Sequence, residues 1–271
     1  MLARIRNAAK TLARRWCEPL HIEFNLTDFC NLNCKGCSLY SPLAPAEFQG
    51  LRDLEEQMKH ISQIKGVRKI KYVFLIGGET LLYPDIIPAM GLARKFFPWA
   101  EITVFTNGLP IPKMGDDFWR ACRANDCSIA ITRYPIKFDY DKIEDLCRDK
   151  GVKAHIFGDR NMENSFFRLP LDPEKKQNGN LAHFRCFSHG CITVDNGRIF
   201  PCSTSACVGH LNRRFGTDYR WEKGDYIEIK NLTDVKQLLR LRNRPVPFCG
   251  YCKHIEPVKY GPSRRALEEW T

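Results

Sequence analysis

Apolar and polar positions recur in a regular order through the first 157 residues of the chain. Residues 21–27 alternate between the two kinds, as half-buried strands do, and residues 71–76 are almost uniformly apolar, as strands covered on both faces are. Further strands are predicted over residues 101–106, 128–132 and 152–157. Apolar residues at helical spacing predict four helices between them, over residues 53–64, 85–97, 116–124 and 141–149.

Five strands that alternate with four helices predict an α/β fold with a parallel sheet, either part of a barrel or an open doubly wound sheet. A complete eight-unit barrel takes about 250 residues, whereas this pattern ends at Phe157. A full barrel is therefore excluded. Residues 158–184 show no sustained period, and we expect a linker or lid there.

A second structural signal follows this segment. Residues 191–195 and 198–202 flank Asn196-Gly197, which is the strongest short-range signal of a β-hairpin. A two-residue turn would place Cys191 opposite Cys202. A short helix over residues 234–241 and a proline-rich loop over residues 242–252 come next.

These patterns divide the chain into five parts. We expect a basic N-terminal helix over residues 1–19, the partial (β/α) barrel over 20–160, a linker or lid over 161–185, a small β-hairpin and helix extension over 186–256, and a C-terminal tail over 257–271.

The composition is that of a soluble globular protein, with 44% hydrophobic and 27% charged residues among 271. No apolar run reaches the roughly 18 residues of a membrane span, and the first 16 residues lack the apolar core of a signal peptide. The net charge of +11 permits an anionic substrate. Nucleic acid is an unlikely partner because no known binding-module signature accompanies that charge.

The 13 cysteines are the unusual feature of the composition. Their odd number excludes complete pairing within one chain. Many cysteines without an export signal indicate a reducing compartment, where thiols serve metals or chemistry. We therefore expect a cytoplasmic protein.

Cys30, Cys34 and Cys37 lie within eight residues of the loop after the first strand. Three thiolates in one loop can hold three corners of an iron–sulfur cube and leave the fourth iron open for chemistry. A zinc site with a fourth ligand from elsewhere is the alternative. Unliganded core cysteines fit poorly, because the intervening residues are polar.

Further polar and glycine signals follow the later strands. Gly77, Gly78 and Glu79 come after the second strand, Asn107 after the third, and Thr132 and Arg133 end the fourth. Sites in parallel α/β folds assemble at the carboxyl ends of the strands. We therefore expect these residues and the three cysteines on one rim.

This arrangement of motifs resembles the radical SAM superfamily over roughly residues 22–157. The resemblance implies a radical SAM partial barrel in which Cys30, Cys34 and Cys37 bind a [4Fe–4S] cluster and the open iron binds S-adenosylmethionine (SAM). It implies that Gly77, Gly78 and Glu79 meet the methionine amino group, and that Thr132 or Arg133, with Asn107, face the ribose or carboxylate. Gly36 stands where the family often has an aromatic residue near adenine.

The resemblance also implies the reaction. One electron from the cluster cleaves SAM, and the resulting 5′-deoxyadenosyl radical removes a hydrogen atom from an unactivated carbon. An electron donor such as flavodoxin or ferredoxin is then an expected partner.

A second set of cysteines follows residue 185, and its four ligand positions are Cys186 or Cys191, Cys202, Cys249 and Cys252. The set resembles the SPASM and twitch extensions of radical SAM enzymes, which implies one auxiliary [4Fe–4S] cluster. The family's spacing favours Cys186 and the hairpin admits Cys191, while zinc remains a real alternative. The spare cysteine and Cys207 are candidate hydrogen donors or, more simply, small core residues.

Three functions fit these observations. The first is a radical SAM enzyme, an oxidoreductase or epimerase, acting on a small polar substrate, for which a carbohydrate-like molecule is one candidate. The second is a SPASM-type maturase of a peptide or protein. The third is a non-catalytic iron–sulfur or zinc protein, which would not cleave SAM when reduced.

Overall fold

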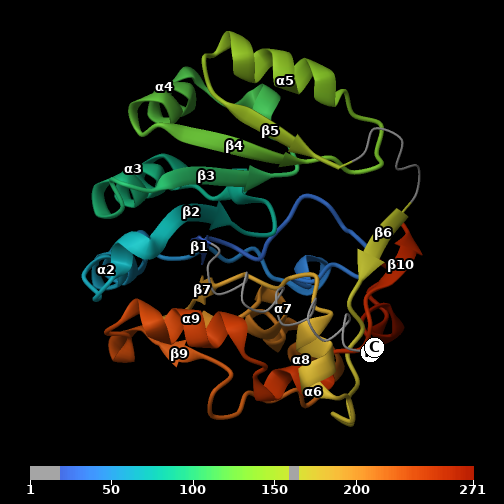
Figure 1. The fold of residues 1–271 in the computed structure, drawn as a ribbon. Coiled ribbons are helices and arrows are strands. Elements are labelled where there is room, and N and C mark those ends of the chain that lie inside the picture. Colours follow the sequence, from blue (N-terminus) through green and yellow to red (C-terminus); the bar gives the residue numbers. More distant parts are fainter. Residues whose placement is uncertain (1–18, 159–164) are drawn as a thin grey trace, which may run out of the picture.

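The computed structural model describes residues 19–158 and 165–271. Its main element is an eight-stranded sheet in the order β5-β4-β3-β2-β1-β7-β8-β9 (Figure 1). Strands β1 to β5 span Leu20–Asn25, Ile70–Ile76, Glu101–Thr106, Cys127–Thr132 and Ala154–Phe157, and each pairs with its neighbour in parallel. Helices α2 to α5 span Leu51–Ser62, Ile86–Phe96, Asp116–Ala124 and Tyr140–Asp149. The predicted partial (β/α) barrel is therefore confirmed.

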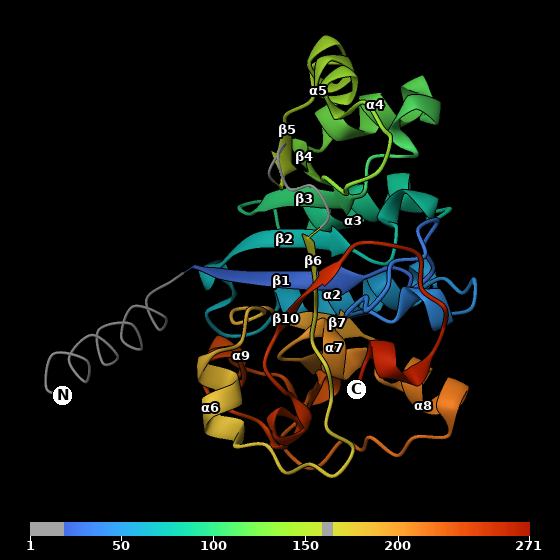
Figure 2. The ribbon, with the colours of Figure 1, turned by 90° about the vertical axis from the view of Figure 1, so that its right-hand side faces the viewer.

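The two faces of this sheet differ because successive side chains of a strand point to opposite sides. On β1, Ile22 and Phe24 are buried in the core that also contains apolar residues of α2 to α5. Figure 2 shows α3 and α4 together on one side of the sheet. His21 and Glu23 alternate with Ile22 and Phe24 and so belong to the opposite, concave face.

The predicted hairpin is present as β7 (Thr193–Asp195) and β8 (Arg198–Phe200). Asn196 and Gly197 have φ values of 44° and 74°, as a type I′ turn requires. Strand β7 pairs in parallel with β1, and β8 pairs with β9 (Ile227–Glu228). The hairpin therefore extends the sheet of the barrel itself.

The segment expected to be a linker or lid contains two regular elements, β6 (Ser165–Arg168) and α6 (Gly179–Phe184). Strand β6 pairs antiparallel with β10 (Glu256–Lys259), which lies at the end of the chain. Because the two paired segments are so distant in sequence, neither shows a periodic pattern of apolar residues that would identify it as a strand. The predicted basic helix over residues 1–19 lies, except for Pro19, outside the described residues.

The remaining elements of the second half pack around a smaller apolar cluster that includes Tyr40, Phe200, Phe248 and Trp270. They are helices α7 (Ser203–Ala206) and α8 (Gly209–Phe215) and the 3-10 turn over Pro247–Tyr251. Helix α9 (Val235–Asn243) instead buries Val235, Leu238 and Leu241 in the core of the barrel. Asp234 caps α9 in a capping box with Gln237.

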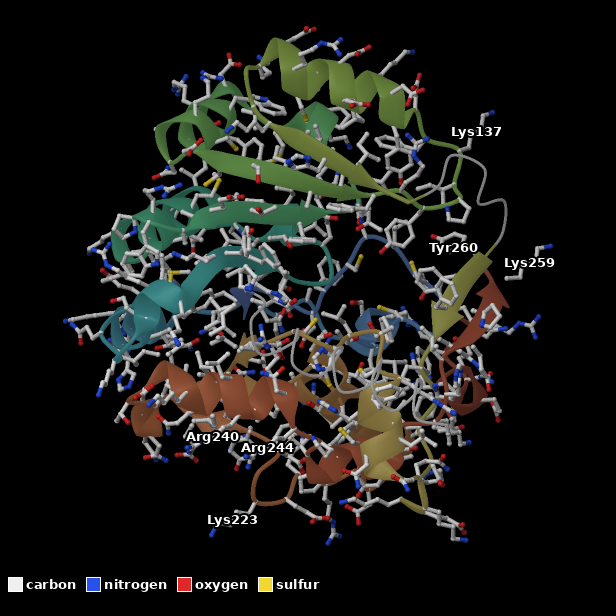
Figure 3. All side chains as sticks on the ribbon, in the orientation of Figure 1. Lys137, Lys223, Arg240, Arg244, Lys259 and Tyr260 are labelled. Atoms are coloured by element: carbon white, nitrogen blue, oxygen red, sulfur yellow. The ribbon has the colours of Figure 1, made fainter. Side chains whose placement is uncertain are left out.

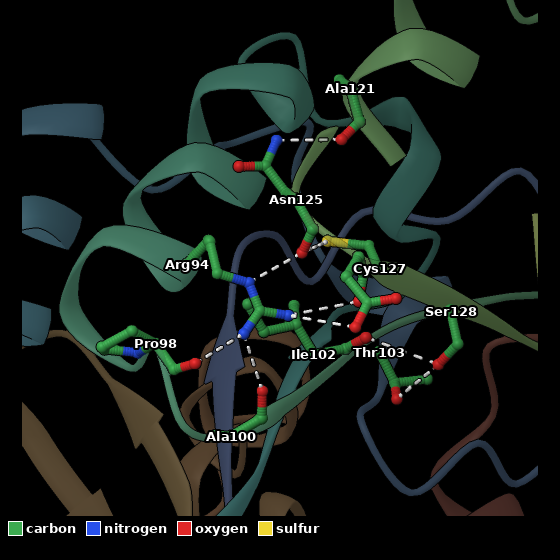
Figure 4. Close-up of polar contacts among 10 residues, drawn as sticks. Arg94, Pro98, Ala100, Ile102, Thr103, Ala121, Asn125, Cys127 and Ser128 are labelled. Atoms are coloured by element: carbon green, nitrogen blue, oxygen red, sulfur yellow. Dashed lines mark hydrogen bonds and ion pairs between the residues drawn. The ribbon is translucent and has the colours of Figure 1, made fainter. Parts of the chain in front are cut away.

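Three further cysteines, which stand singly in the sequence, are buried beside the helices. Cys122, Cys127 and Cys147 are at most 5% exposed. Figure 4 shows Arg94 near Cys127, where its guanidinium donates to the carbonyl oxygens of Asn125, Pro98 and Ala100 at 2.8–3.1 Å. These bonds hold α3 against the start of β4. None of the described helices is long and apolar enough to cross a membrane.

Candidate functional site

Cys30, Cys34 and Cys37 lie in the loop after β1, at the carboxyl edge of the parallel strands. All three line one cavity of about 210 Å³. The cavity is also lined by residues from the ends of the neighbouring strands and from the second half of the chain: Glu23, Ile76, Gly77, Gly78, Phe105, Thr106, Asn107, Thr132, Tyr134, Cys191 and Ser203. Of the rim residues expected from sequence, Gly77, Gly78, Asn107 and Thr132 thus line this cavity together with the three cysteines.

The paired glycines let the loop after β2 approach the loop after β1. A Cβ on Gly77 would lie 2.5 Å from the carbonyl oxygen of Thr27, and one on Gly78 would lie 2.5 Å from those of Asp28 and Phe29. The amide of Gly78 donates to Thr27 O at 2.7 Å. Only glycine permits this contact, which positions the backbone directly before Cys30.

Glu79 has a different place from the one that the resemblance implies. Its side chain is fully buried and is absent from the cavity wall. One carboxylate oxygen accepts from Thr106 Oγ1 at 2.6 Å and from the Leu81 amide at 3.0 Å, and the other accepts from the Asn107 amide at 2.7 Å. Burial raises the pKa of this carboxyl, although the three hydrogen bonds oppose the rise. Glu79 therefore ties the end of β3 to the end of β2.

The other rim residues divide into two kinds. Asn107 and Thr132 face the cavity, and Asn107 Nδ2 donates to Asn31 Oδ1 at 2.7 Å beside Cys30. Arg133 is turned away from it. Its guanidinium pairs with Asp141 at 3.2 Å and stacks over Tyr140 at 5.1 Å.

The end of the chain covers the cysteine loop. Tyr260 Oη lies 3.6 Å from Cys34 Sγ, and the indole of Trp270 donates to Cys37 O at 3.0 Å. Gly36 has a φ of 69°, and a Cβ there would lie 2.8 Å from Cβ of Arg168 on β6. Figure 1 shows β6 and β10 on the side toward which the arrowheads of β3 and β4 point.

Three aromatic rings stand beside this loop. The ring centroids of Tyr134, Phe166 and Tyr260 are 5.6–6.0 Å apart. Tyr134 lines the cavity, and Figure 3 shows Tyr260 turned toward the interior while Lys259 points outward. These rings supply aromatic surface near the cysteines, which Gly36 cannot.

The second set of cysteines forms its own cavity of about 140 Å³. Its walls include the thiols of Cys186, Cys202, Cys249 and Cys252, which come from three separate segments. Burial raises the pKa of Cys249 to about 12 and raises that of Cys252 well above its ordinary value, and the charges of other members of the set add to both shifts. Four cysteines around one cavity match in number and kind the donor set of a four-ligand cluster.

Cys191 lines the first cavity, whereas the other four cysteines line the second. Its thiol is still near enough to those of Cys202 and Cys186 for their charges to raise its pKa. The adjacent residues Cys202 and Ser203 face the second and the first cavity respectively. The two cavities therefore lie on either side of one short stretch of backbone.

Cys191 lies in a cluster that the sequence did not reveal. Ligand atoms of Cys191, Glu23 and His21 all lie within 4.8 Å of one another. Glu23 accepts from Thr193 Oγ1 at 2.8 Å and lies 3.5 Å from His21 Nε2. Burial alone would raise the pKa of Glu23, but His21, Thr193 and Cys191 stabilise the carboxylate and lower it.

Cys207 belongs to a buried polar network behind the cysteine loop. Its thiol donates to Asp28 Oδ1 at 3.4 Å, and His210 Nε2 lies 2.6 Å from Asp28 Oδ2. Arg213 donates to His210 Nδ1 at 2.7 Å. The cysteine is 3% exposed and is not part of the wall of the first cavity.

A row of rings crosses the concave face of the sheet. His21 stacks on Phe74 with a centroid distance of 5.1 Å, Phe74 contacts Phe105 at 4.9 Å, and Phe105 stacks on Phe157 at 6.5 Å. Phe157 is 53% exposed. The row leads from the edge of the sheet to the first cavity, which Phe105 lines.

Sequence reasoning missed His21, Glu23, Tyr134 and Tyr260. The alternation along residues 21–27 places His21 and Glu23 on one face of a strand. An ionisable residue on a strand that must be buried is unusual, so Glu23 could have been recognised as a candidate functional residue. Nothing local signalled Tyr260, because it reaches the site through the pairing of β10 with β6.

Comparisons with known proteins agree with this geometry. Residues 24–151 match the model of the Radical SAM superfamily. The chain is 29% identical over 98 residues to a GTP 3′,8-cyclase of Alkaliphilus metalliredigens (strain QYMF), which is 35% of this chain and 30% of that protein. It is 24% identical over 99 residues to a GTP 3′,8-cyclase of Heliobacterium modesticaldum (strain ATCC 51547 / Ice1). The chain thus spans about a third of the length of these curated relatives.

One solved structure is similar over most of the chain. It is BtrN in complex with AdoMet and 2-DOIA, with a TM-score of 0.51 and 14% identity, and the match covers 86% of this chain and 92% of that one. At this identity the likeness concerns the fold, and it extends beyond the barrel into the second half of the chain.

Proposed function

Because residues 24–151 match the model of the radical SAM superfamily, we propose that the whole protein is a radical SAM enzyme acting on a small polar substrate. The observation that carries the proposal is the meeting of Cys30, Cys34 and Cys37 with Gly77 and Gly78 on one cavity at the carboxyl edge of the sheet. The superfamily uses a [4Fe–4S] cluster and SAM.

The residues present fit these two cofactors. Three soft thiolate donors from one loop can hold a cluster and leave one iron free. When bound, the cluster and SAM supply a 5′-deoxyadenosyl radical that abstracts hydrogen from carbon. The chain's own residues orient that chemistry and exclude water from it. Tyr260 and Trp270 cover the cysteine loop, and Glu79 holds the loops after β2 and β3 together.

We assign SAM contacts to the residues that face the cavity. Gly77 and Gly78 present backbone, while Asn107 and Thr132 present polar side chains at the ends of β3 and β4. Tyr134 offers an aromatic face for adenine in place of the residue at Gly36. Arg133 and Glu79 act as positioning residues, because Arg133 Nη2 pairs with Asp141 and the Glu79 carboxylate is bonded within the protein.

We assign an auxiliary [4Fe–4S] cluster of the twitch kind to Cys186, Cys202, Cys249 and Cys252. Their common cavity supports this set over one that contains Cys191. The adjoining position of the first cavity would let a substrate lie between the two cofactors. An electron donor such as flavodoxin or ferredoxin and a cytoplasmic location belong to the same proposal.

The reaction itself is oxidation or epimerisation. A cavity with carboxylate, hydroxyl and amide groups beside aromatic rings suits a compact polar molecule with a carbon skeleton. A peptide maturase is the second candidate, because the half-exposed row of rings ending at Phe157 offers surface for a longer substrate.

The test is anaerobic reconstitution followed by iron analysis and SAM cleavage. The proposal expects about eight irons per chain and release of 5′-deoxyadenosine upon reduction with dithionite. Joint replacement of Cys30, Cys34 and Cys37 by alanine should abolish cleavage and remove about four irons. Bound zinc without SAM cleavage in a well-folded protein would overturn the proposal and leave a metal-binding protein.

A further inference from the structure

Cys191 is a free thiol on the wall of the cavity that holds the three cluster cysteines. It is distinct from the four cysteines of the second cavity. Two groups attend it, since Glu23 and His21 place their polar atoms within 4.8 Å of its sulfur and of each other. A thiol and a carboxylate on the cavity wall, with an imidazole beside them, form an arrangement that none of the assignments above uses.

We propose that Cys191 donates a hydrogen atom to the substrate radical, with Glu23 and His21 as the positioning residues that return a proton to its sulfur. The inference rests on the proposed function and deepens it. A substrate radical that receives a hydrogen atom becomes a product with the same oxidation state as the substrate. The geometry therefore favours epimerisation over oxidation.

The S–H bond of Cys191 breaks homolytically, a C–H bond forms on the substrate, and a sulfur-centred radical remains. One electron from a low-potential one-electron donor, the class that also reduces the cluster, converts this radical to a thiolate. A proton then restores the thiol. The S–H bond is weaker than the C–H bond formed, so the transfer is favourable.

The surroundings of the Cys191 sulfur suit both the donation of a hydrogen atom and the later return of a proton. Burial and the negative charge of Glu23 raise the pKa of Cys191, so the resting group carries its hydrogen. Glu23 is fixed by Thr193 Oγ1 at 2.8 Å and by its own amide, which donates to Ile192 O at 2.8 Å. The side chain of His21 is 23% exposed and lies 3.5 Å from Glu23, which connects the buried carboxylate to solvent.

Cys207 is the competing candidate, and the structure argues against it. It is buried behind the cysteine loop and bonded to Asp28, and it does not reach the wall of the first cavity. The two cysteines therefore make a matched pair for a test, because both are free and only one faces the reaction space.

The experiment needs no identified substrate. The reconstituted enzyme is reduced with SAM in D2O, where thiol hydrogens exchange for deuterium and carbon-bound hydrogens do not. Without substrate, the 5′-deoxyadenosyl radical takes its hydrogen from the weakest nearby bond. We expect mostly monodeuterated 5′-deoxyadenosine from the wild type and from Cys207→Ser. Cys191→Ala and Cys191→Ser should lower the deuterated fraction at least fivefold while SAM is still cleaved.

Metal analysis and a count of turnovers test the cavity thiol and its neighbour Glu23 separately. Iron and zinc per chain should be unchanged in Cys191→Ala, whereas Cys186→Ala should lose iron. Glu23→Gln should deliver deuterium to the first 5′-deoxyadenosine per chain and then stall, because the sulfur is no longer recharged with a proton. A merely structural role for Glu23 would lower the first and later turnovers alike.

The outcomes separate this inference from the proposed function. Absence of SAM cleavage in the wild type would overturn both. Cleavage without deuterium, or deuterium that disappears in Cys207→Ser and persists in Cys191→Ala, would overturn the inference alone. Loss of a bound metal in Cys191→Ala would also overturn it, because the cluster of Cys191, Glu23 and His21 would then be a metal site.

Discussion

Replacement of Gly78 by alanine tests the contact between the two loops most directly. The added Cβ would lie 2.5 Å from the carbonyl oxygens of Asp28 and Phe29 and 2.7 Å from the carbonyl carbon of Phe29. Ordinary van der Waals contact begins at 3.4 Å, so the loop must move by about 0.9 Å (3.4 − 2.5). All the clashing atoms are backbone, and no side chain can rotate away.

The cost can be estimated from this geometry. Overpacking of a rigid contact costs typically 1–3 kcal/mol, and the shift also strains the Gly78 N to Thr27 O and Glu79 N to Phe29 O bonds of 2.7 and 2.9 Å. We expect destabilisation of about 3 kcal/mol, which corresponds to a fall in Tm of roughly 10 °C for a chain of this size. The displaced backbone leads directly into Cys30, so iron retention should fall as well.

The matched control is Gly91→Ala. Gly91 lies within α3, and no atom stands within 4 Å of the position of an added Cβ. Alanine there should stabilise the helix by about 0.5–1 kcal/mol. Differential scanning fluorimetry and iron analysis of both anaerobic variants would check the pair. A Gly78→Ala protein with the Tm and iron content of the wild type would refute the close approach of the loops.

Three further predictions concern other parts of the site. Burial and the charge of Asp28 raise the pKa of Asp195 to about 6, above its ordinary value of 3.8. The folded state therefore binds the proton more tightly than the unfolded state, and the free energy of unfolding falls as the pH rises from about 4 to 6. Asp195→Asn should therefore exceed the wild type in stability by up to about 3 kcal/mol above pH 6 and match it near pH 4, in denaturant titrations across that range; equal profiles would contradict this. Tyr134→Leu should weaken SAM binding about tenfold in equilibrium dialysis while the iron content stays unchanged, and Tyr134→Phe should bind SAM as the wild type does. Tyr260→Phe removes the hydroxyl 3.6 Å from Cys34 Sγ, and it should shift the electron paramagnetic resonance signal of the reduced first cluster without loss of iron.

Local patterns in the sequence were sufficient for the barrel. The strand over Glu101–Thr106 and the helix over Asp116–Ala124 occur with the predicted bounds. Each strand or helix of the barrel has its own periodic pattern of apolar residues and its own terminating residue. Each also packs against the element that follows it along the chain. The Asn196-Gly197 turn was equally visible, because the backbone conformation of such a turn depends on those two residues.

Long-range pairing accounts for what the sequence did not reveal. Strand β6 meets β10 across about ninety residues, so neither segment carried a period that identified its partner. The choice between Cys186 and Cys191 was open for the same reason. Both lie close to the hairpin in sequence, and only the packing shows that Cys186 shares a cavity with Cys249 and Cys252.

Cofactor motifs are also incomplete guides to side-chain roles. Gly-Gly-Glu pointed to the correct rim, yet a Cβ at either glycine would meet the backbone of the loop after β1, and Glu79 bonds within the protein. The motif therefore secures the cysteine loop first, and any contact with SAM depends on backbone that the same packing has fixed.

The second half of the chain completes the first cavity as well as forming its own. Strand β7 extends the sheet beyond β1, and the chain just before it brings Cys191 beside Glu23. His210 on α8 holds Asp28, two residues before Cys30, at 2.6 Å. Any shift of the extension would therefore move both the free thiol and the base of the first cysteine loop. An isolated barrel of residues 20–160 would lack Cys191, Tyr260 and Trp270, and we expect it to lose control of the radical even where it retains the three cluster cysteines.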